Sequence, residues 1–201
     1  MRQSHSSVLS AARLAPFVRC ALRFVPSITA IVLMIGLPTV AQHDVHAQLI
    51  AKAMRKNAPQ FHLRSADGKI VQLSDFKGKV VLVNFWATNC GGCVLEIPSF
   101  IELQRKYGDK SFTVVGISAD IPYGGLKGPE EAWQKVRPFV AQHHINYPIV
   151  MGDDAVIDAF GFKAYPATFL IDKSGLIAAS YVGVVSKDDV SSNISKLLAE
   201  H

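Results

Sequence analysis

The chain consists of short apolar runs separated by turn-rich and amphipathic stretches. Residues 80–86 and 112–119 are almost continuously apolar, which is typical of strands buried on both faces of a sheet. Residues 130–144 place Trp133, Val136 and Val140 on one face of an expected helix. The other expected elements are strands at 61–64, 69–73, 167–171 and 176–182, and helices at 93–107, 155–160 and 188–198.

The order of these elements predicts the fold class. The expected order is strand, helix, strand and helix, followed by a strand hairpin and a last helix. This order predicts an α/β domain whose mixed central sheet is covered by helices on both faces. The first two strands are joined by Asp67-Gly68, which is a hairpin turn signal. We assign residues 58–201 to this domain. Residues 42–57 are polar with scattered apolar positions, and we expect them to be a linker, either a tether or a short helix.

Residues 1–41 have the pattern of an export leader. Residues 24–41 carry no charge, and their most apolar part is shorter than the roughly 20 residues of a spanning helix. A cleaved signal peptide is expected, ending at Thr39-Val40-Ala41, with Val45-His46-Ala47 as a weaker cleavage motif. The alternative is an uncleaved anchor formed by residues 24–41, and in both cases the domain is exported. The arginines that precede the apolar run are Arg2, Arg13, Arg19 and Arg23.

The net charge of +5 does not indicate nucleic-acid binding, because the basic excess lies in the leader. Four of the 21 Lys and Arg residues precede Asp44, and no Asp or Glu precedes it. From Asp44 onward, the chain therefore has 17 basic residues and all 16 Asp and Glu residues. The domain is therefore nearly neutral. This excludes a basic groove for nucleic acid as the leading function.

The candidate chemistry is in Cys90-Gly91-Gly92-Cys93, between a buried strand and a helix. A thiolate there is stabilised by free backbone N–H groups and the helix dipole, and the second sulfur can reach the first. Half of a zinc site and a structural disulfide are the alternatives. The third cysteine, Cys20, lies in the leader, so there is no second pair. Export to an oxidising compartment favours the redox interpretation.

Several motifs together resemble the TlpA/ResA-like periplasmic thioredoxins. The resemblance covers residues 58–198, and it implies a thioredoxin fold with an N-terminal β-hairpin extension and an inserted strand and helix. The matching motifs, in chain order, are Ala58-Pro59-Gln60-Phe61, Leu73-Ser74-Asp75-Phe76-Lys77-Gly78-Lys79, Trp86-Ala87-Thr88-Asn89-Cys90-Gly91-Gly92-Cys93 with Glu96 and Pro98, and Tyr165-Pro166-Ala167-Thr168-Phe169-Leu170-Ile171-Asp172.

This resemblance also implies roles for four residues. Cys90 matches the exposed attacking thiol, Cys93 the buried resolving thiol, and Pro166 a cis-proline opposite the dithiol. Glu96 matches a buried acid that holds or relays the proton of Cys93. The alternatives are an ordinary trans proline at Pro166 and, for Glu96, a first-turn carboxylate favoured only by the helix dipole.

The implied function is an exported thiol:disulfide oxidoreductase that reduces protein disulfides in the periplasm, either soluble or anchored to the inner membrane. It would use no cofactor other than the Cys90–Cys93 disulfide, and no metal. Its electrons would come from a membrane thiol-disulfide donor, and apocytochrome c or a copper-site protein would be its client. The alternative function is a copper(I) chaperone with the same two cysteines as soft ligands.

Two departures from the family pattern concern the site itself. Asn89 precedes the first cysteine, where the family usually has an aromatic residue. The dipeptide Gly91-Gly92 supplies neither a stiffening proline nor a positively charged histidine. A strongly oxidising site needs a specially stabilised thiolate, so we expect a moderately reducing potential. A peroxidase of the same superfamily is disfavoured, because Thr88 is two residues before Cys90 rather than three.

Overall fold

The computed structural model describes residues 44–200. The predicted leader, residues 1–41, falls outside these residues. Within residues 44–200, no helix combines the length and the apolar character that crossing a membrane requires.

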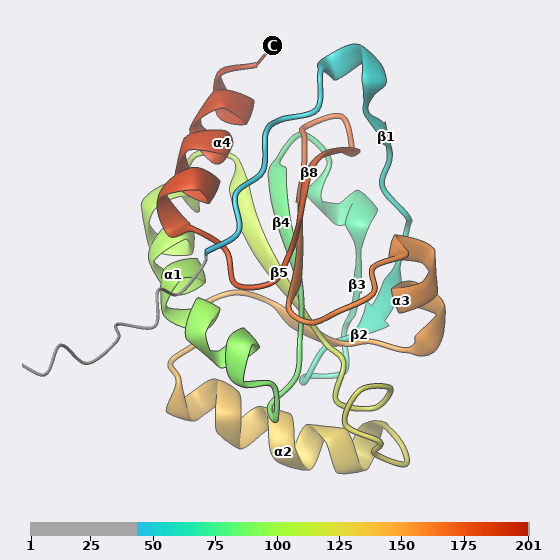
Figure 1. Ribbon diagram of the computed structural model, residues 1–201. Coiled ribbons are helices and arrows are strands. Elements are labelled where there is room, and N and C mark those ends of the chain that lie inside the picture. The colour runs from blue at the N-terminus through green and yellow to red at the C-terminus, as the bar shows by residue number, and fades with distance from the viewer. Residues whose placement is uncertain (1–43, 201) are drawn as a thin grey trace, which may run out of the picture. The chain divides into compact units, whose positions relative to one another are not determined.

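A six-stranded mixed sheet forms the centre of the domain, in the strand order β1-β8-β7-β4-β5-β6 (Figure 1). β4 and β6 are both parallel to β5, whereas β7 is antiparallel to β4 and β8 is antiparallel to β7. A separate hairpin consists of β2 and β3. The strands are β1 (Lys56–Asn57), β2 (His62–Arg64), β3 (Ile70–Gln72), β4 (Val80–Trp86), β5 (Phe112–Ser118), β6 (Ile149–Met151), β7 (Ala167–Ile171) and β8 (Leu176–Val182).

Helices cover both faces of this sheet. All seven residues of β4 are buried. Its alternate side chains enter two cores, with Leu82 and Trp86 in one and Val83 and Phe85 in the other. The first core also contains side chains of α1, α2 and α4, and the second contains side chains of α3 and the hairpin. The helices are α1 (Gly91–Tyr107), α2 (Pro129–Gln142), α3 (Asp154–Phe160) and α4 (Lys187–Ala199), with short 3-10 turns at Lys52–Met54 and Leu73–Phe76.

This architecture confirms the predicted mixed sheet, the hairpin extension and the order of elements. The unit α2–β6 is the inserted helix and strand, and it extends the sheet beyond β5. Sequence analysis did not place β6, because three residues after Pro148 are too few to show a period. It also started α1 two residues late, since Gly91 and Gly92 are poor helix formers whose helical state depends on the cap at Cys90.

The predicted linker at 42–57 is wrong for the residues that the structure describes. Val45, Ala47 and Leu49 are half-buried and pack against the first core. β1 then pairs with β8, and the Arg55 guanidinium is enclosed by Asp172 and Glu200 at 3.0 and 2.6 Å. The domain therefore begins well before residue 58, because this segment buries apolar side chains and completes an edge of the sheet.

Candidate active site

The two cysteines of the motif form a disulfide where β4 gives way to α1. The S–S distance is 2.04 Å and the Cα atoms are 5.3 Å apart. Cys90 is the N-cap of α1, and its Sγ accepts a hydrogen bond of 3.3 Å from the Cys93 N–H. The N-terminal turn of the helix thus directs its positive end at the sulfur of Cys90. In the reduced protein, this geometry lowers the energy of a Cys90 thiolate.

Cys90 is buried, whereas the resemblance implied an exposed thiol. Cys90 is 5% exposed and Cys93 is 1% exposed, and both belong to the first core. The neighbouring Gly92 is also closely packed, since a Cβ at that position would lie 3.3 Å from Pro166 Cδ and 3.4 Å from Val184 Cγ2. Gly91, by contrast, is exposed and has no neighbouring atom within 4 Å of its Cβ position. A substrate would therefore approach over Gly91.

Pro166 lies directly against the motif. The Tyr165–Pro166 peptide bond, expected to be cis, is cis in the structure. Pro166 is buried beside Gly92, and its carbonyl accepts a hydrogen bond of 2.8 Å from Gly183 N–H. Gly92 and Pro166, which are 74 positions apart in the chain, thereby lie side by side next to the cysteines.

Glu96 is buried behind the cysteines. It is 1% exposed, and Cys93 is three residues earlier on the same helix. Its Oε1 accepts a hydrogen bond of 2.9 Å from Val185 N–H, and its Oε2 accepts one of 3.3 Å from the Asn84 amide. Burial raises the pKa of Glu96 to about 8, although both hydrogen bonds oppose this shift. Glu96 also lies beyond the first turn of α1, so it is not the first-turn carboxylate of the alternative interpretation.

Asn84 is a site residue that sequence analysis missed. It lies in β4, is 1% exposed, and also donates a hydrogen bond of 3.0 Å to Thr168 Oγ1 on β7. The available signal was its position as the single polar residue in an otherwise apolar strand. A buried amide requires partners, and here they are Thr168 and Glu96.

A second missed residue, Asp120, holds the turn before the motif. Asp120 is 1% exposed and accepts hydrogen bonds from the backbone N–H and the hydroxyl of Thr88, and from the hydroxyl of Ser118. The turn that carries Asn89 and Cys90 is thus fixed to the end of β5. Asn89 itself is exposed.

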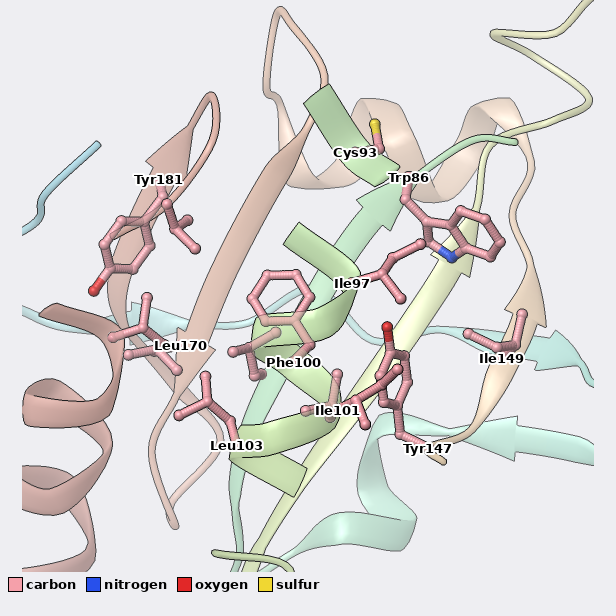
Figure 2. Close-up of a cluster of buried hydrophobic side chains, with 14 of the residues drawn as sticks. Trp86, Cys93, Ile97, Phe100, Ile101, Leu103, Tyr147, Ile149, Leu170 and Tyr181 are labelled. Carbon is pink, nitrogen blue, oxygen red and sulfur yellow. The ribbon is translucent and has the colours of Figure 1, made fainter. Parts of the chain in front are cut away.

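The surroundings of the buried sulfur are otherwise apolar. Figure 2 shows Cys93 at one end of a cluster that also contains Trp86, Ile97 and Phe100. Trp86 is 1% exposed, and its indole stacks on Phe139 with centroids 5.1 Å apart, so it is a core residue. Within residues 44–200, no group of three or more His, Cys, Asp and Glu side chains is placed to hold a metal ion.

Comparisons with known proteins show the family and the fold of this chain. The profile of the AhpC/TSA family matches residues 54–180. The thiol-disulfide oxidoreductase ResA of Bacillus thuringiensis subsp. konkukian is 32% identical over 143 residues, which cover 71% of this chain and 77% of that protein. The thioredoxin-like protein YneN of Bacillus subtilis is 31% identical over 139 residues, 69% of this chain and 77% of that protein. A solved thiol:disulfide interchange protein of the thioredoxin family from Chlorobium tepidum has a TM-score of 0.63 and 31% identity, over 74% of this chain and all of the other.

Proposed function

Because this chain belongs to the AhpC/TSA family, and within it to the TlpA/ResA-like thiol-disulfide oxidoreductases, we propose that its Cys90–Cys93 pair reduces disulfides of exported proteins. One observation carries the proposal. Cys90 caps the N-terminus of α1, Gly92 between the two cysteines lies against cis-Pro166, and the buried carboxyl group of Glu96 lies one helical turn beyond Cys93. These features serve thiolate formation, substrate contact and proton transfer, respectively.

The proposed reaction begins with the reduced protein. The Cys90 thiolate attacks one sulfur of the substrate disulfide, a mixed disulfide forms, and the other substrate sulfur leaves as a thiolate. Cys93 then transfers its thiol proton to the Glu96 carboxylate and attacks the Cys90 sulfur. The Cys90–Cys93 disulfide forms and the second substrate sulfur leaves, so two electrons have passed to the substrate. A membrane thiol-disulfide donor would return two electrons.

The direction of the reaction is tested by the reduction potential. Gly91 and Gly92 supply only backbone amides to the Cys90 thiolate, which is modest stabilisation of the reduced form. We expect a potential closer to the roughly −270 mV of thioredoxin than to the roughly −120 mV of strongly oxidising periplasmic oxidants. Equilibration with glutathione or dithiothreitol buffers measures it, and turnover of an insulin disulfide confirms reductase activity. A potential near the oxidising limit would contradict a reductase.

The proposed location is the periplasm, with the client an exported protein such as apocytochrome c or a copper-site protein. Support comes from the leader pattern of residues 1–41 and from the resemblance to periplasmic thioredoxins. A reporter that is active only after export, fused after His201 of the full chain, should be active. The same fusion with the four leader arginines changed to glutamate is the matched control and should be silent. A silent reporter on the unaltered chain would refute export.

A further inference from the structure

The loop of residues 183–186, between β8 and α4, contacts the site at several points. Gly183 N–H donates a hydrogen bond of 2.8 Å to the carbonyl of Pro166. Val184 Cγ2 lies 3.4 Å from the position that a Cβ on Gly92 would occupy. This loop is therefore packed against both the cis-proline and the dipeptide between the cysteines.

The same loop holds the buried acid. Val185 N–H donates a hydrogen bond of 2.9 Å to Glu96 Oε1. This bond favours the carboxylate form of Glu96 and opposes the effect of burial. The position of one backbone N–H in the 183–186 loop thus affects the proton affinity of the acid that is proposed to serve Cys93.

A segment far away in the chain fixes this loop from its other side. We call residues 44–50 the strap. Val45 N–H donates a hydrogen bond of 2.7 Å to Val184 O, and Ser186 N–H donates one of 3.0 Å to Val45 O. These two bonds flank Val185, whose own N–H points to Glu96. In addition, a Cβ on Gly183 would lie 3.0 Å from Val45 Cγ2.

The strap is itself tied to the domain at two further places. Ala47 N–H donates to Asp189 Oδ2 at 3.1 Å, and the Asn193 amide donates to Ala47 O at 2.7 Å. Ile50 N–H donates to Ala178 O at 2.8 Å. In Figure 1 the strap is the blue segment that passes beside α4. Because these hydrogen bonds fix the strap to the domain, the strap in turn restricts where the backbone of the 183–186 loop can lie.

We propose that the strap is a positioning element of the redox site: by clamping the backbone on both sides of Val185, it holds the Val185 N–H at Glu96. The inference rests on the proposed role of Glu96 in proton transfer. It also bears on processing of the chain. Cleavage after Ala41 keeps Val45, whereas cleavage at the weaker motif after Ala47 would remove the clamp.

The ionisable groups near Glu96 determine whether a pH titration of the oxidised protein detects Glu96 alone. Within residues 44–200, its hydrogen-bond partners are Val185 and Asn84. Tyr147, before β6, interacts with Glu96 electrostatically, and burial raises the pKa of its hydroxyl beyond the range of such an experiment. Cys93, three residues before Glu96 on α1, does not titrate while it is joined to Cys90 as a disulfide. A titration of the oxidised protein near pH 8 therefore reports Glu96.

Val45→Pro in the full chain tests the proposal, because proline lacks the N–H that bonds Val184. The matched control is Gln48→Pro, in the same strap, at an exposed residue whose N–H bonds no other residue among those described. The carboxyl carbon of Glu96 is followed by NMR in the oxidised protein. We expect its titration midpoint to rise by about 0.5–1 unit in Val45→Pro. Disulfide exchange at pH 7 should fall about 3- to 10-fold. Gln48→Pro should match the wild type in both.

An unchanged Glu96 midpoint in folded Val45→Pro, or an equal shift in Gln48→Pro, would overturn the proposal. Should Val45→Pro not fold, Ala47→Pro removes only the bond to Asp189 and should shift the midpoint upward by less; no shift would again overturn it. Failure of the Glu96 role is a separate result. It would appear as an unchanged pH–rate profile in Glu96→Gln, whereas the NMR midpoint still reports whether the strap positions the N–H.

Discussion

Replacement of Cys93 by serine is expected to abolish turnover and to leave substrates covalently attached to Cys90. Serine is nearly isosteric with cysteine, but its hydroxyl cannot displace a sulfur from the mixed disulfide. The first step is retained, because Cys90 keeps its place at the N-cap of α1. Non-reducing electrophoresis followed by mass spectrometry of the adducts should identify the client proteins. Multiple-turnover reduction of an insulin disulfide should fall to the uncatalysed rate.

The matched variant Cys90→Ser separates the two thiols. It should be equally inactive, but it should accumulate no mixed disulfide, since Cys93 is 1% exposed. In the reduced wild type, iodoacetamide should modify Cys90 before Cys93, because only Cys90 receives the helix N–H groups. Trapping by Cys90→Ser rather than by Cys93→Ser would reverse the two roles.

Glu96→Gln is expected to slow disulfide exchange on the order of 10²-fold, if proton transfer from Cys93 limits the rate. The wild-type pH–rate profile should contain an ionisation near 8, because burial raises the pKa of Glu96 to about 8. Gln does not titrate, so the variant should lose this ionisation and retain that of Cys90. Glu102→Gln is the control, since Glu102 is exposed on the same helix and pairs with Lys187. An unaltered profile in Glu96→Gln would leave Glu96 without a catalytic role.

The same substitution should change the pH dependence of stability in a defined direction. The folded pKa of Glu96 lies above its ordinary value of 4.5, so its favourable contribution is fully present below pH 4.5 and is lost as the pH rises through 8. Wild-type stability should therefore decline over this window more than that of Glu96→Gln. Between pH 5 and pH 9, the unfolding free energy of the wild type should fall by about 3–5 kcal/mol more than that of Glu96→Gln. Urea denaturation of the oxidised proteins at both pH values measures it.

Local sequence determined the part of the site that lies on β4 and α1. The apolar run of residues 80–86 is buried on both faces, as predicted, because continuous apolar residues require cover on each side. The motif lies at the junction of this strand with a helix, as predicted, although α1 begins two residues earlier than predicted, and the helical repeat places Glu96 one turn beyond Cys93. These features depend on neighbours in the chain, so spacing and residue type suffice to predict them.

Tertiary structure decided what surrounds these residues. Glu96 is buried because β4 and the 183–186 loop close over it, and its N–H partner Val185 is 89 residues away. Cys90 is 5% exposed, because the folded domain packs it into the first core. The segment at 44–50 forms part of the domain because its partners are backbone groups near the other end of the chain, such as those of Val184 and Ser186. Pairings of this kind leave no period in the local sequence, because backbone N–H and C=O groups are the same at every residue.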